Sequence, residues 1–409
     1  MNVISKFATR TKEYGIKYVM QVILQQKIYR PLNNITQRYC NKIYRNHSLK
    51  NIIVIESHND FDSNGGAFYN YLIKNKYNDK YKIVWLIKHP EYIPKKLPKN
   101  VECVPFYKFN LRKHYYICNA KYLFADNEIT RKAKKSQISI YMCHGAFGLK
   151  NVKSVLPDSS DIDYVISSSK NYNSILAEQV GVEKEKMLIT GYPFHDVLFD
   201  GKEGDLYKIV DKLNYNKVIM WMPTFRKGGG NWRNDICSEQ EYGIPIINSD
   251  QQFEILSEFL QERNNLLIIK IHPKQNQKTI TKLKNRKNII ILTTDDMKKY
   301  GLDNYKLLKD VDALISDYSS IMYSYLLLNR PMGFVLSDLK EYKLGLVTDN
   351  AEDFIAGDKI FDFNGLLNFI TDVSKGKDEY EKKRKDIMRW LYDDIDGNSC
   401  ARICAVLNL

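Results

Sequence analysis

Residues 266–274 read LLIIKIHPK, an almost wholly apolar run that ends in histidine, proline and lysine. Such a run is typical of a strand that is buried on both faces of a parallel sheet. Pro273 fixes the backbone where the chain leaves this strand. Side chains that follow the strand gather at the carboxyl edge of the sheet, where open α/β sheets bind ligands. We therefore expect His272 and Lys274 to face a binding cleft.

The same pattern of short apolar runs and helical stretches extends outward from this segment in both directions. Strands are predicted at residues 52–56, 82–87, 101–104, 122–124, 138–142, 164–167 and 187–189, and again at 217–221, 266–271, 289–292, 313–315 and 332–336. Helices are predicted at residues 67–74, 111–118, 172–180, 251–262, 305–309 and 320–328, with a final helix at 379–392 and a turn at Asn64-Gly65-Gly66. This alternation predicts an α/β protein with two Rossmann-like domains that face a cleft.

The predicted domain boundaries follow from the two series of strands. We expect a basic segment at residues 1–50, an N-terminal domain at 51–204, a C-terminal domain at 205–378 and a C-terminal helical segment at 379–409. No GxGxxG follows the first strand and no GxxxxGK[ST] occurs, which argues against a nicotinamide dehydrogenase and a P-loop NTPase. Seven cysteines occur without a CxxC pair, which suggests neither a zinc site nor disulfides and points to a reducing cytosol.

The positive charge lies mainly in the first segment. Residues 1–50 hold ten Lys and Arg residues and one acid, a balance of +9, and the net charge of the whole chain is +14. A basic amphipathic helix is predicted at residues 4–29, interrupted by Pro31, and such a helix suits an anionic membrane surface. The alternative is a solvated helix that packs on the body. No nucleic-acid module accompanies the charge, and no run of about 18 apolar residues predicts a transmembrane helix.

Two polar clusters follow strands of the first series. His144-Gly145 follows residues 138–142, where a histidine can take a proton near neutral pH and a glycine admits a ligand close to the backbone. The alternative for His144 is a buried hydrogen-bonding role. Gly191-Tyr192-Pro193 follows residues 187–189 and is either a ligand contact or a structural hinge.

Two more clusters follow strands of the second series. In Pro223-Thr224-Phe225-Arg226 the arginine is suited to phosphate oxygens, although an exposed loop is the alternative. In Ser316-Asp317-Tyr318-Ser319-Ser320 a serine is expected to cap a helix whose free amides form an anion site, or to serve as a cap alone. The acidic pair Asp295-Asp296 falls in a predicted polar loop, so no metal is expected.

Taken together, the chain resembles the CDP-glycerol glycerophosphotransferase family, whose members build teichoic acids and related bacterial capsule polymers. The resemblance rests on an ordered set of motifs: His144-Gly145, Gly191-Tyr192-Pro193, Pro223-Thr224-Phe225-Arg226, His272-Pro273, Ser316-Asp317-Tyr318-Ser319-Ser320 and the ending Asp396-Gly397…Arg402-Ile403. It covers residues 51–403 and implies a GT-B architecture. The family usually has an arginine where Phe194 stands and an acid where Ser324 stands, and Ala146-Phe147 replaces its usual Thr-Pro.

The resemblance implies a reaction in which an acceptor hydroxyl attacks the β-phosphorus of CDP-glycerol or another CDP-polyol, and CMP leaves. The acceptor would be a lipid-linked or growing envelope polymer at the cytoplasmic face of the bacterial membrane, with no obligatory cofactor. The implied catalytic residues are His144 and His272. The donor site would comprise Thr224, Arg226, Lys274, Asp317, Ser319 and Ser320, and the acceptor side Gly145, Gly191, Tyr192 and Pro193. The alternatives are a GT-B glycosyltransferase that uses a nucleotide sugar and a non-catalytic, membrane-associated envelope assembly protein.

Overall fold

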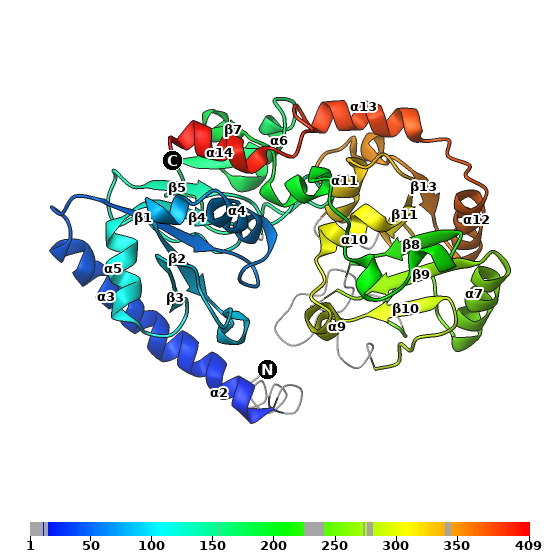
Figure 1. The fold of residues 1–409 in the computed structure, drawn as a ribbon, viewed down its shortest axis with the longest axis horizontal. Helices are drawn as coiled ribbons and strands as arrows, with labels where there is room; N and C mark the ends of the chain where they lie inside the picture. Colours follow the sequence, from blue (N-terminus) through cyan, green and yellow to red (C-terminus); the bar gives the residue numbers. More distant parts are fainter. Residues whose placement is uncertain are drawn as a thin grey trace.

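Two parallel β-sheets organise the chain (Figure 1). The computed structural model describes residues 11, 15–154, 156–224, 241–272, 275, 281–339 and 345–409. The first sheet has seven strands in the order β3-β2-β1-β4-β5-β6-β7. They are β1 (Lys50–Glu56), β2 (Lys82–Ile87), β3 (Val101–Pro105), β4 (Ala120–Ala125), β5 (Ile138–Tyr141), β6 (Tyr164–Ser167) and β7 (Met187–Ile189). We call the part of the chain that carries this sheet the N-terminal half.

The second sheet, in the C-terminal half, has six strands in the order β10-β9-β8-β11-β12-β13. They are β8 (Lys217–Trp221), β9 (Asn265–Lys270), β10 (Ile289–Leu292), β11 (Ala313–Ser316), β12 (Met332–Val335) and β13 (Asp358–Ile360). The strand order reverses between β1 and β4 in the first sheet and between β8 and β11 in the second, which places a ligand crevice beyond the carboxyl ends of these pairs. The predicted α/β class with two Rossmann-like sheets in a GT-B arrangement is confirmed; the domain boundaries stay a prediction.

Helices cover the two sheets, and the C-terminal ones return to the first sheet. They are α4 (Ser63–Lys74), α5 (Leu111–Asn119) and α6 (Asn173–Val180), then α7 (Asp250–Glu262), α9 (Thr294–Lys299), α10 (Asn304–Asp310), α11 (Ile321–Leu326) and α12 (Phe363–Ser374), and finally α13 (Glu381–Leu391) and α14 (Ser399–Leu407). Figure 1 shows α13 passing between the halves and α14 lying against the N-terminal half, where the Tyr122 hydroxyl donates to the Leu407 carbonyl at 2.9 Å. The helix predicted at residues 379–392 is present as α13, but it is not the final helix because α14 follows it, and α12 and β13 were not predicted.

Two segments that were predicted as turn or loop are helical. Asn64-Gly65-Gly66 lies in the first turn of α4, where the Asn64 amide donates to the carbonyls of Met142 and Cys143 at 2.7 and 2.8 Å. These tertiary bonds outweigh the low helix propensity of glycine. Asp295-Asp296 lies in α9, where Asp296 and Thr293 form a capping box that satisfies free amides of the helix.

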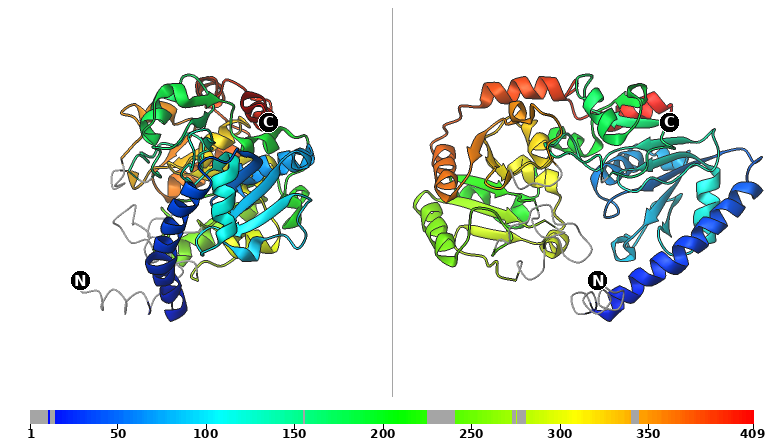
Figure 2. Two further views of the ribbon diagram at one scale, coloured as in Figure 1. Left: turned by 90° about the vertical axis from the view of Figure 1, so that its left-hand side faces the viewer. Right: turned by 180° about the vertical axis from the view of Figure 1, so that it is seen from behind.

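The basic segment forms one long helical arm along the N-terminal half (Figures 1 and 2). It comprises α2 (Ile16–Leu24), a π-helical turn η1 (Gln25–Tyr29) and α3 (Arg30–Ile43). The predicted interruption at Pro31 is wrong, because the proline lies in the first turn of α3. The Arg30 amide bonds back to the Gln25 carbonyl, five residues earlier, and this wider turn leaves room for a proline ring that would clash in a regular helix. Residues 1–10 and 12–14 lie outside the described residues.

A buried histidine anchors the arm to the body. The two ring nitrogens of His114, on α5, lie 2.7 Å from Gln37 Oε1 and 3.1 Å from Asn33 Oδ1 on α3. Burial lowers the pKa of His114 to about 4, so the ring is neutral and its single N–H donates to one of these two amide oxygens. Among the described residues no helix is both long enough and apolar enough to cross a membrane.

Another buried histidine joins the two halves. His195 lies after β7 in a short 3₁₀ helix, η5 (Pro193–Phe199), and its Nε2 is 2.9 Å from Ser324 Oγ on α11. A backbone hydrogen bond also joins the two halves: the Asn151 amide donates to the Gly345 carbonyl at 3.0 Å. The contact between the halves therefore includes the buried, neutral hydrogen bond of His195.

We predict that His195 makes the protein sensitive to acid. Burial lowers the pKa of His195 from 6.5 to about 3, so the unfolded chain binds this proton more tightly and stability is lost as the pH falls from about 6.5 toward 3. His195→Gln does not titrate, so its Tm should fall less than that of the wild type between about pH 6.5 and pH 4. His47→Gln, at an exposed histidine, serves as the matched control and should follow the wild type. Parallel curves for His195→Gln and the wild type would contradict the prediction.

Candidate active site

His144 stands at the carboxyl edge of the first sheet. It follows β5 directly after Cys143, whose φ of 57° is left-handed, and its side chain is exposed. A left-handed conformation is uncommon in residues other than glycine and turns the chain sharply at this point. The rings of His144 and His58 are 4.7 Å apart, and His58 Nδ1 lies 3.1 Å from Asn127 Oδ1. His58 follows β1 and Asn127 follows β4, so the two imidazoles lie at the point where the strand order reverses.

Thr224 and Asp317 occupy the matching point of the second sheet. Thr224 follows β8 and Asp317 follows β11, and these two strands are neighbours. The Thr224 amide donates to one carboxylate oxygen of Asp317 at 2.9 Å and its hydroxyl to the other at 2.5 Å. Asp317 is fully buried, so its carboxylate positions Thr224 and thereby the start of the following segment.

The two edges meet through a lysine and two glycines. Lys150 Nζ, from the N-terminal half, donates to the Thr224 hydroxyl at 3.0 Å and lies 5.3 Å from the centre of the Tyr318 ring. A Cβ atom on Gly145 would lie 2.7 Å from Ser320 Oγ, and one on Gly148 would lie 3.2 Å from both Ser320 Cα and N. The segment after His144 and the start of α11 therefore approach as closely as glycine allows.

Ser319 and Ser320 are half-buried at this contact. The expectation that a serine caps the helix is wrong for the side chain, because Ser320 has helical backbone angles and makes no side-chain cap bond. A capping side chain requires an extended residue, and Ser320 already lies within the turn. Its hydroxyl is directed toward Gly145 instead.

His272 follows β9, which pairs with β8, so it stands at the same edge as Thr224. It is half-buried, and its carbonyl accepts the Gln275 amide at 2.9 Å. The predicted donor residues Arg226 and Lys274 lie outside the described residues. The donor-side roles of all these residues stay predictions.

Gly191, Tyr192 and Pro193 contact the C-terminal helix. Gly191 has a φ of 75°, and a Cβ atom there would lie 2.6 Å from Ser399 Oγ at the start of α14. Tyr192 is fully buried. The Arg402 side chain donates to the Thr190 carbonyl at 2.9 Å, so the chain after β7 is held to α14. The acceptor-side role of Gly191, Tyr192 and Pro193 stays a prediction.

Sequence reasoning missed a buried charged group beside His58. Glu56, the last residue of β1, forms an ion pair with Lys88 and accepts the amides of Asn127 and Glu128 at 3.0 Å each. Asp126 is completely buried nearby, and burial raises its pKa well above the ordinary value. The available signal was position: Glu56 ends a predicted strand, and Asp126 closely follows another.

The arrangement provides an exposed imidazole and a lysine from the N-terminal half, and hydroxyl groups from the C-terminal half. An imidazole can remove a proton from an alcohol near neutral pH. Serine and threonine hydroxyls together with an ammonium group are donors suited to phosphate oxygens. The geometry therefore fits transfer of a phosphoryl-linked group to a hydroxyl.

Comparison with known proteins gives a family and a fold. The sequence profile of the family "CDP-Glycerol:Poly(glycerophosphate) glycerophosphotransferase" matches residues 40–408. The chain is 28% identical over 283 residues to the teichoic acid glycerol-phosphate primase of Bacillus subtilis, a match over 63% of this chain and 66% of that protein. It is 27% identical over 289 residues to the teichoic acid ribitol-phosphate polymerase TarL of Staphylococcus aureus, over 63% of this chain and 47% of that protein. The chain thus spans less than two thirds of the length of these relatives.

Among solved structures, that of the wall teichoic acid polymerase TagF matches with a TM-score of 0.72 at 20% sequence identity. The match covers 100% of this chain and 98% of that one, so the whole chain shares this fold.

We predict that Gly145 and Gly148 differ in their tolerance of a methyl group. The Ser320 hydroxyl can rotate away from an alanine at 145, whereas an alanine at 148 presses on the Ser320 backbone, which cannot. Gly148→Ala should therefore lower the Tm more than Gly145→Ala, and Ser320→Ala should restore the Tm only of Gly145→Ala. Thermal unfolding of the single and double variants tests this. Rescue of both glycine variants by Ser320→Ala, or of neither, would contradict the assigned contacts.

Proposed function

The chain belongs to the CDP-Glycerol:Poly(glycerophosphate) glycerophosphotransferase family, and we propose that it transfers a polyol phosphate from a CDP-activated donor to a hydroxyl of an envelope polymer, releasing CMP. Glycerol phosphate is the foremost candidate, and the acceptor is lipid-linked or a growing chain. One observation carries the proposal: the segment after His144 meets Ser320 and Thr224 across the two halves through Gly145 and Lys150.

In the proposed reaction the acceptor oxygen forms a bond to the β-phosphorus of the donor, and the bond from that phosphorus to the oxygen of CMP breaks. His144 takes the acceptor proton, because a hydroxyl is a poor nucleophile until it loses that proton. Ser319, Ser320 and Lys150 hold phosphate oxygens, and donors aimed at the developing charge stabilise the transition state. His272, beside Thr224 at the edge of the second sheet, donates to the departing CMP. Arg226 and Lys274 are proposed to add positive charge.

The arm supports peripheral binding to the cytoplasmic face of the membrane. Ten of the nineteen exposed large apolar side chains of the described residues lie on it: Ile16, Tyr18, Met20, Ile23, Leu24, Ile28, Leu32, Ile35, Tyr39 and Ile43. They recur mostly every three or four residues, so they form an outward stripe along one side of the helix. Exposed Lys17 and Lys27 add attraction to anionic lipids, worth about 1 kcal/mol each near the surface.

We predict that Ile28→Asp combined with Ile35→Asp releases the protein from anionic vesicles. An isoleucine side chain that enters the apolar part of the bilayer contributes about 1.5–3 kcal/mol of transfer free energy. Losing both isoleucines should therefore weaken vesicle binding at least tenfold in a sedimentation assay. The control, Leu213→Asp combined with Phe361→Asp, changes two side chains that are 92% and 58% exposed elsewhere on the surface. It should sediment like the wild type. Equal sedimentation of the two double variants would exclude the arm as the membrane contact.

We predict that the wild type forms polyol phosphate products and CMP from CDP-glycerol or CDP-ribitol, and none from UDP-sugars, when products on a lipid-linked acceptor are measured by mass spectrometry. His144→Ala should lose at least a hundredfold in kcat yet still bind the CDP-polyol by calorimetry, since general bases typically contribute about 10²–10⁴-fold. His272→Ala should impair both binding and turnover.

His47→Ala removes an exposed histidine that precedes β1, at the opposite edge of the first sheet, and serves as the control, with unchanged kcat. A near-normal kcat in His144→Ala would remove this residue from the mechanism. Sugar transfer from a UDP-sugar, with no product from CDP-polyols, would instead favour the glycosyltransferase alternative.

A further inference from the structure

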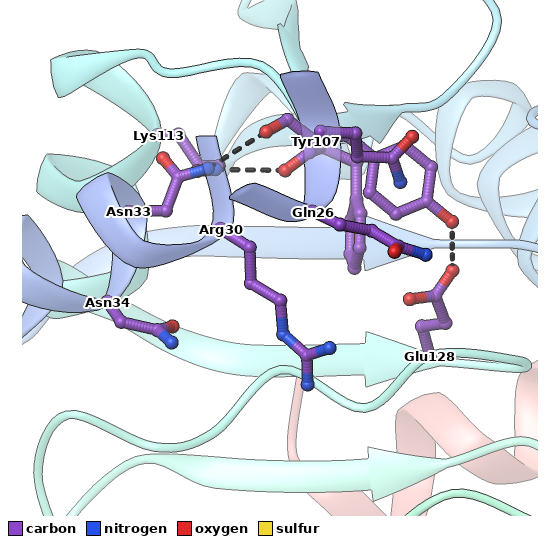
Figure 3. Close-up of a pocket in the computed structure, with 9 residues that line it drawn as sticks. Gln26, Arg30, Asn33, Asn34, Tyr107, Lys113 and Glu128 are labelled. Atoms are coloured by element: carbon purple, nitrogen blue, oxygen red, sulfur yellow. Dashed lines mark hydrogen bonds between the residues drawn. The ribbon is translucent and has the colours of Figure 1, made fainter. Parts of the chain in front are cut away.

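A polar cavity of about 420 Å³ lies between the arm and the body (Figure 3). Its floor comes from the segments that follow β3 and β4, namely Phe106-Tyr107 and Glu128, and its roof from the π-helical turn and the start of α3. These floor segments leave the same carboxyl edge of the sheet as His144, because all strands of the sheet are parallel. The cavity is therefore at the same edge as the candidate active site.

The roof presents one polar face of the helix. Gln26, Arg30 and Asn34 recur every four residues, so they lie along a single side, and all three line the cavity. Figure 3 shows the Arg30 side chain extending from the helix between Asn34 and Glu128. Within the described part of the chain, the Arg30 guanidinium makes no hydrogen bond or ion pair with protein atoms. Its five donors are available to a ligand.

The neighbouring groups, in contrast, have protein partners. Lys113 donates to the Phe106 carbonyl at 2.9 Å, and the Tyr107 hydroxyl donates to Glu128. The Glu128 carboxylate also lies 3.6 Å from Lys88 Nζ, although that ammonium pairs more closely with the buried Glu56. A ligand would therefore meet the guanidinium of Arg30, flanked by side-chain amides, and the Glu128 carboxylate would stay bonded to Tyr107.

This lining selects for a particular chemistry. A guanidinium binds phosphate oxygens through paired hydrogen bonds, while amide side chains both donate to and accept from the hydroxyls of a polyol. The volume falls in the range of about 300–1,000 Å³ that is typical of small-molecule sites, and most of the lining residues have polar side chains. A polyol phosphodiester, with one negative charge and flanking hydroxyls, matches these features.

The cavity also connects with His144 through contacting residues. The Glu128 and Asn127 amides share one oxygen of Glu56, Asn127 contacts His58, and the His58 ring packs against that of His144. A chain bound in the cavity thus lies along the edge that leads to the proposed base. The opposite side of the arm carries the outward apolar stripe, so a lipid-anchored chain would reach the cavity from the membrane surface.

We propose that this cavity is an acceptor subsite, in which Arg30 binds a phosphodiester of the acceptor polymer away from its reacting hydroxyl. The inference rests on the proposed function for its biological meaning, but the binding itself does not require turnover. An anionic phospholipid headgroup presents the same phosphodiester chemistry, and the test must separate the two sources.

The test uses the full chain and glycerophosphoglycerol, a soluble polyol phosphodiester, in calorimetry without vesicles. The wild type should bind it, Arg30→Ala should bind at least tenfold more weakly, and Arg30→Lys should bind with intermediate affinity. Arg38→Ala is the matched control, because it removes the same exposed cation two turns further along α3, outside the cavity. It should bind like the wild type, and the Tm values should agree because Arg30 has no partner to lose.

In turnover with a soluble acceptor, Arg30→Ala should raise the acceptor KM at least tenfold and leave the donor KM unchanged. Absence of wild-type binding, or equal binding by Arg30→Ala, would overturn the subsite. Normal binding of the soluble diester by Arg30→Ala, with loss of phosphatidylglycerol vesicle binding beyond that of Arg38→Ala, would also overturn it and indicate a headgroup site. If the wild type binds the diester through Arg30 but transfers nothing from CDP-polyols, the subsite stands and the proposed function fails.

Discussion

The buried carboxylate of Asp317 holds both the amide and the hydroxyl of Thr224, and Lys150 reaches the same hydroxyl from the other half. A buried carboxyl group must have partners for its oxygens, and leaving one unpaired costs about 1–3 kcal/mol. These bonds therefore fix the chain after β8 to the chain after β11, at the point where the strand order reverses. Ser319 and Ser320 follow Asp317 almost at once, so their position depends on this contact. Lys150 bonds to Thr224 at the same contact, so the segment that carries His144 is held there as well.

A second set of contacts holds the C-terminal helix α14 to the N-terminal half. Asp196 accepts the amides of Ser399 and Cys400 at 2.9 Å each, which satisfies free donors at the start of α14. Gly191 and Gly397 both have left-handed backbones and both face side chains that leave no room for a Cβ atom. The segments around Gly191 and Gly397, which are distant in the sequence, thus pack closely against each other. The C-terminal segment consequently ties the exit of the first sheet to the last helices of the second.

The sequence predicted most of the sheets because their strands are buried on both faces and appear as apolar runs with polar ends. The bounds of β8 were predicted to the residue, and His144 and Thr224 were placed correctly after their strands. Features that depend on tertiary contacts were missed. The edge strand β13 has only one buried residue, and α14 takes its amide partners from Asp196. Likewise, His58 lies next to His144 only because β1, β4 and β5 are neighbours, which no local pattern reveals.

The departures from the family pattern at Phe194 and Ser324 occur in one place. Phe194 stacks on Tyr305 with ring centres 4.4 Å apart, while Ser324 bonds to the adjacent His195, and all of these contacts are between the halves. Where the family has an arginine and an acid, this chain has an aromatic ring and a hydroxyl. Both positions therefore present neutral groups beside His195, and the contact between the halves is one in which this histidine stays uncharged.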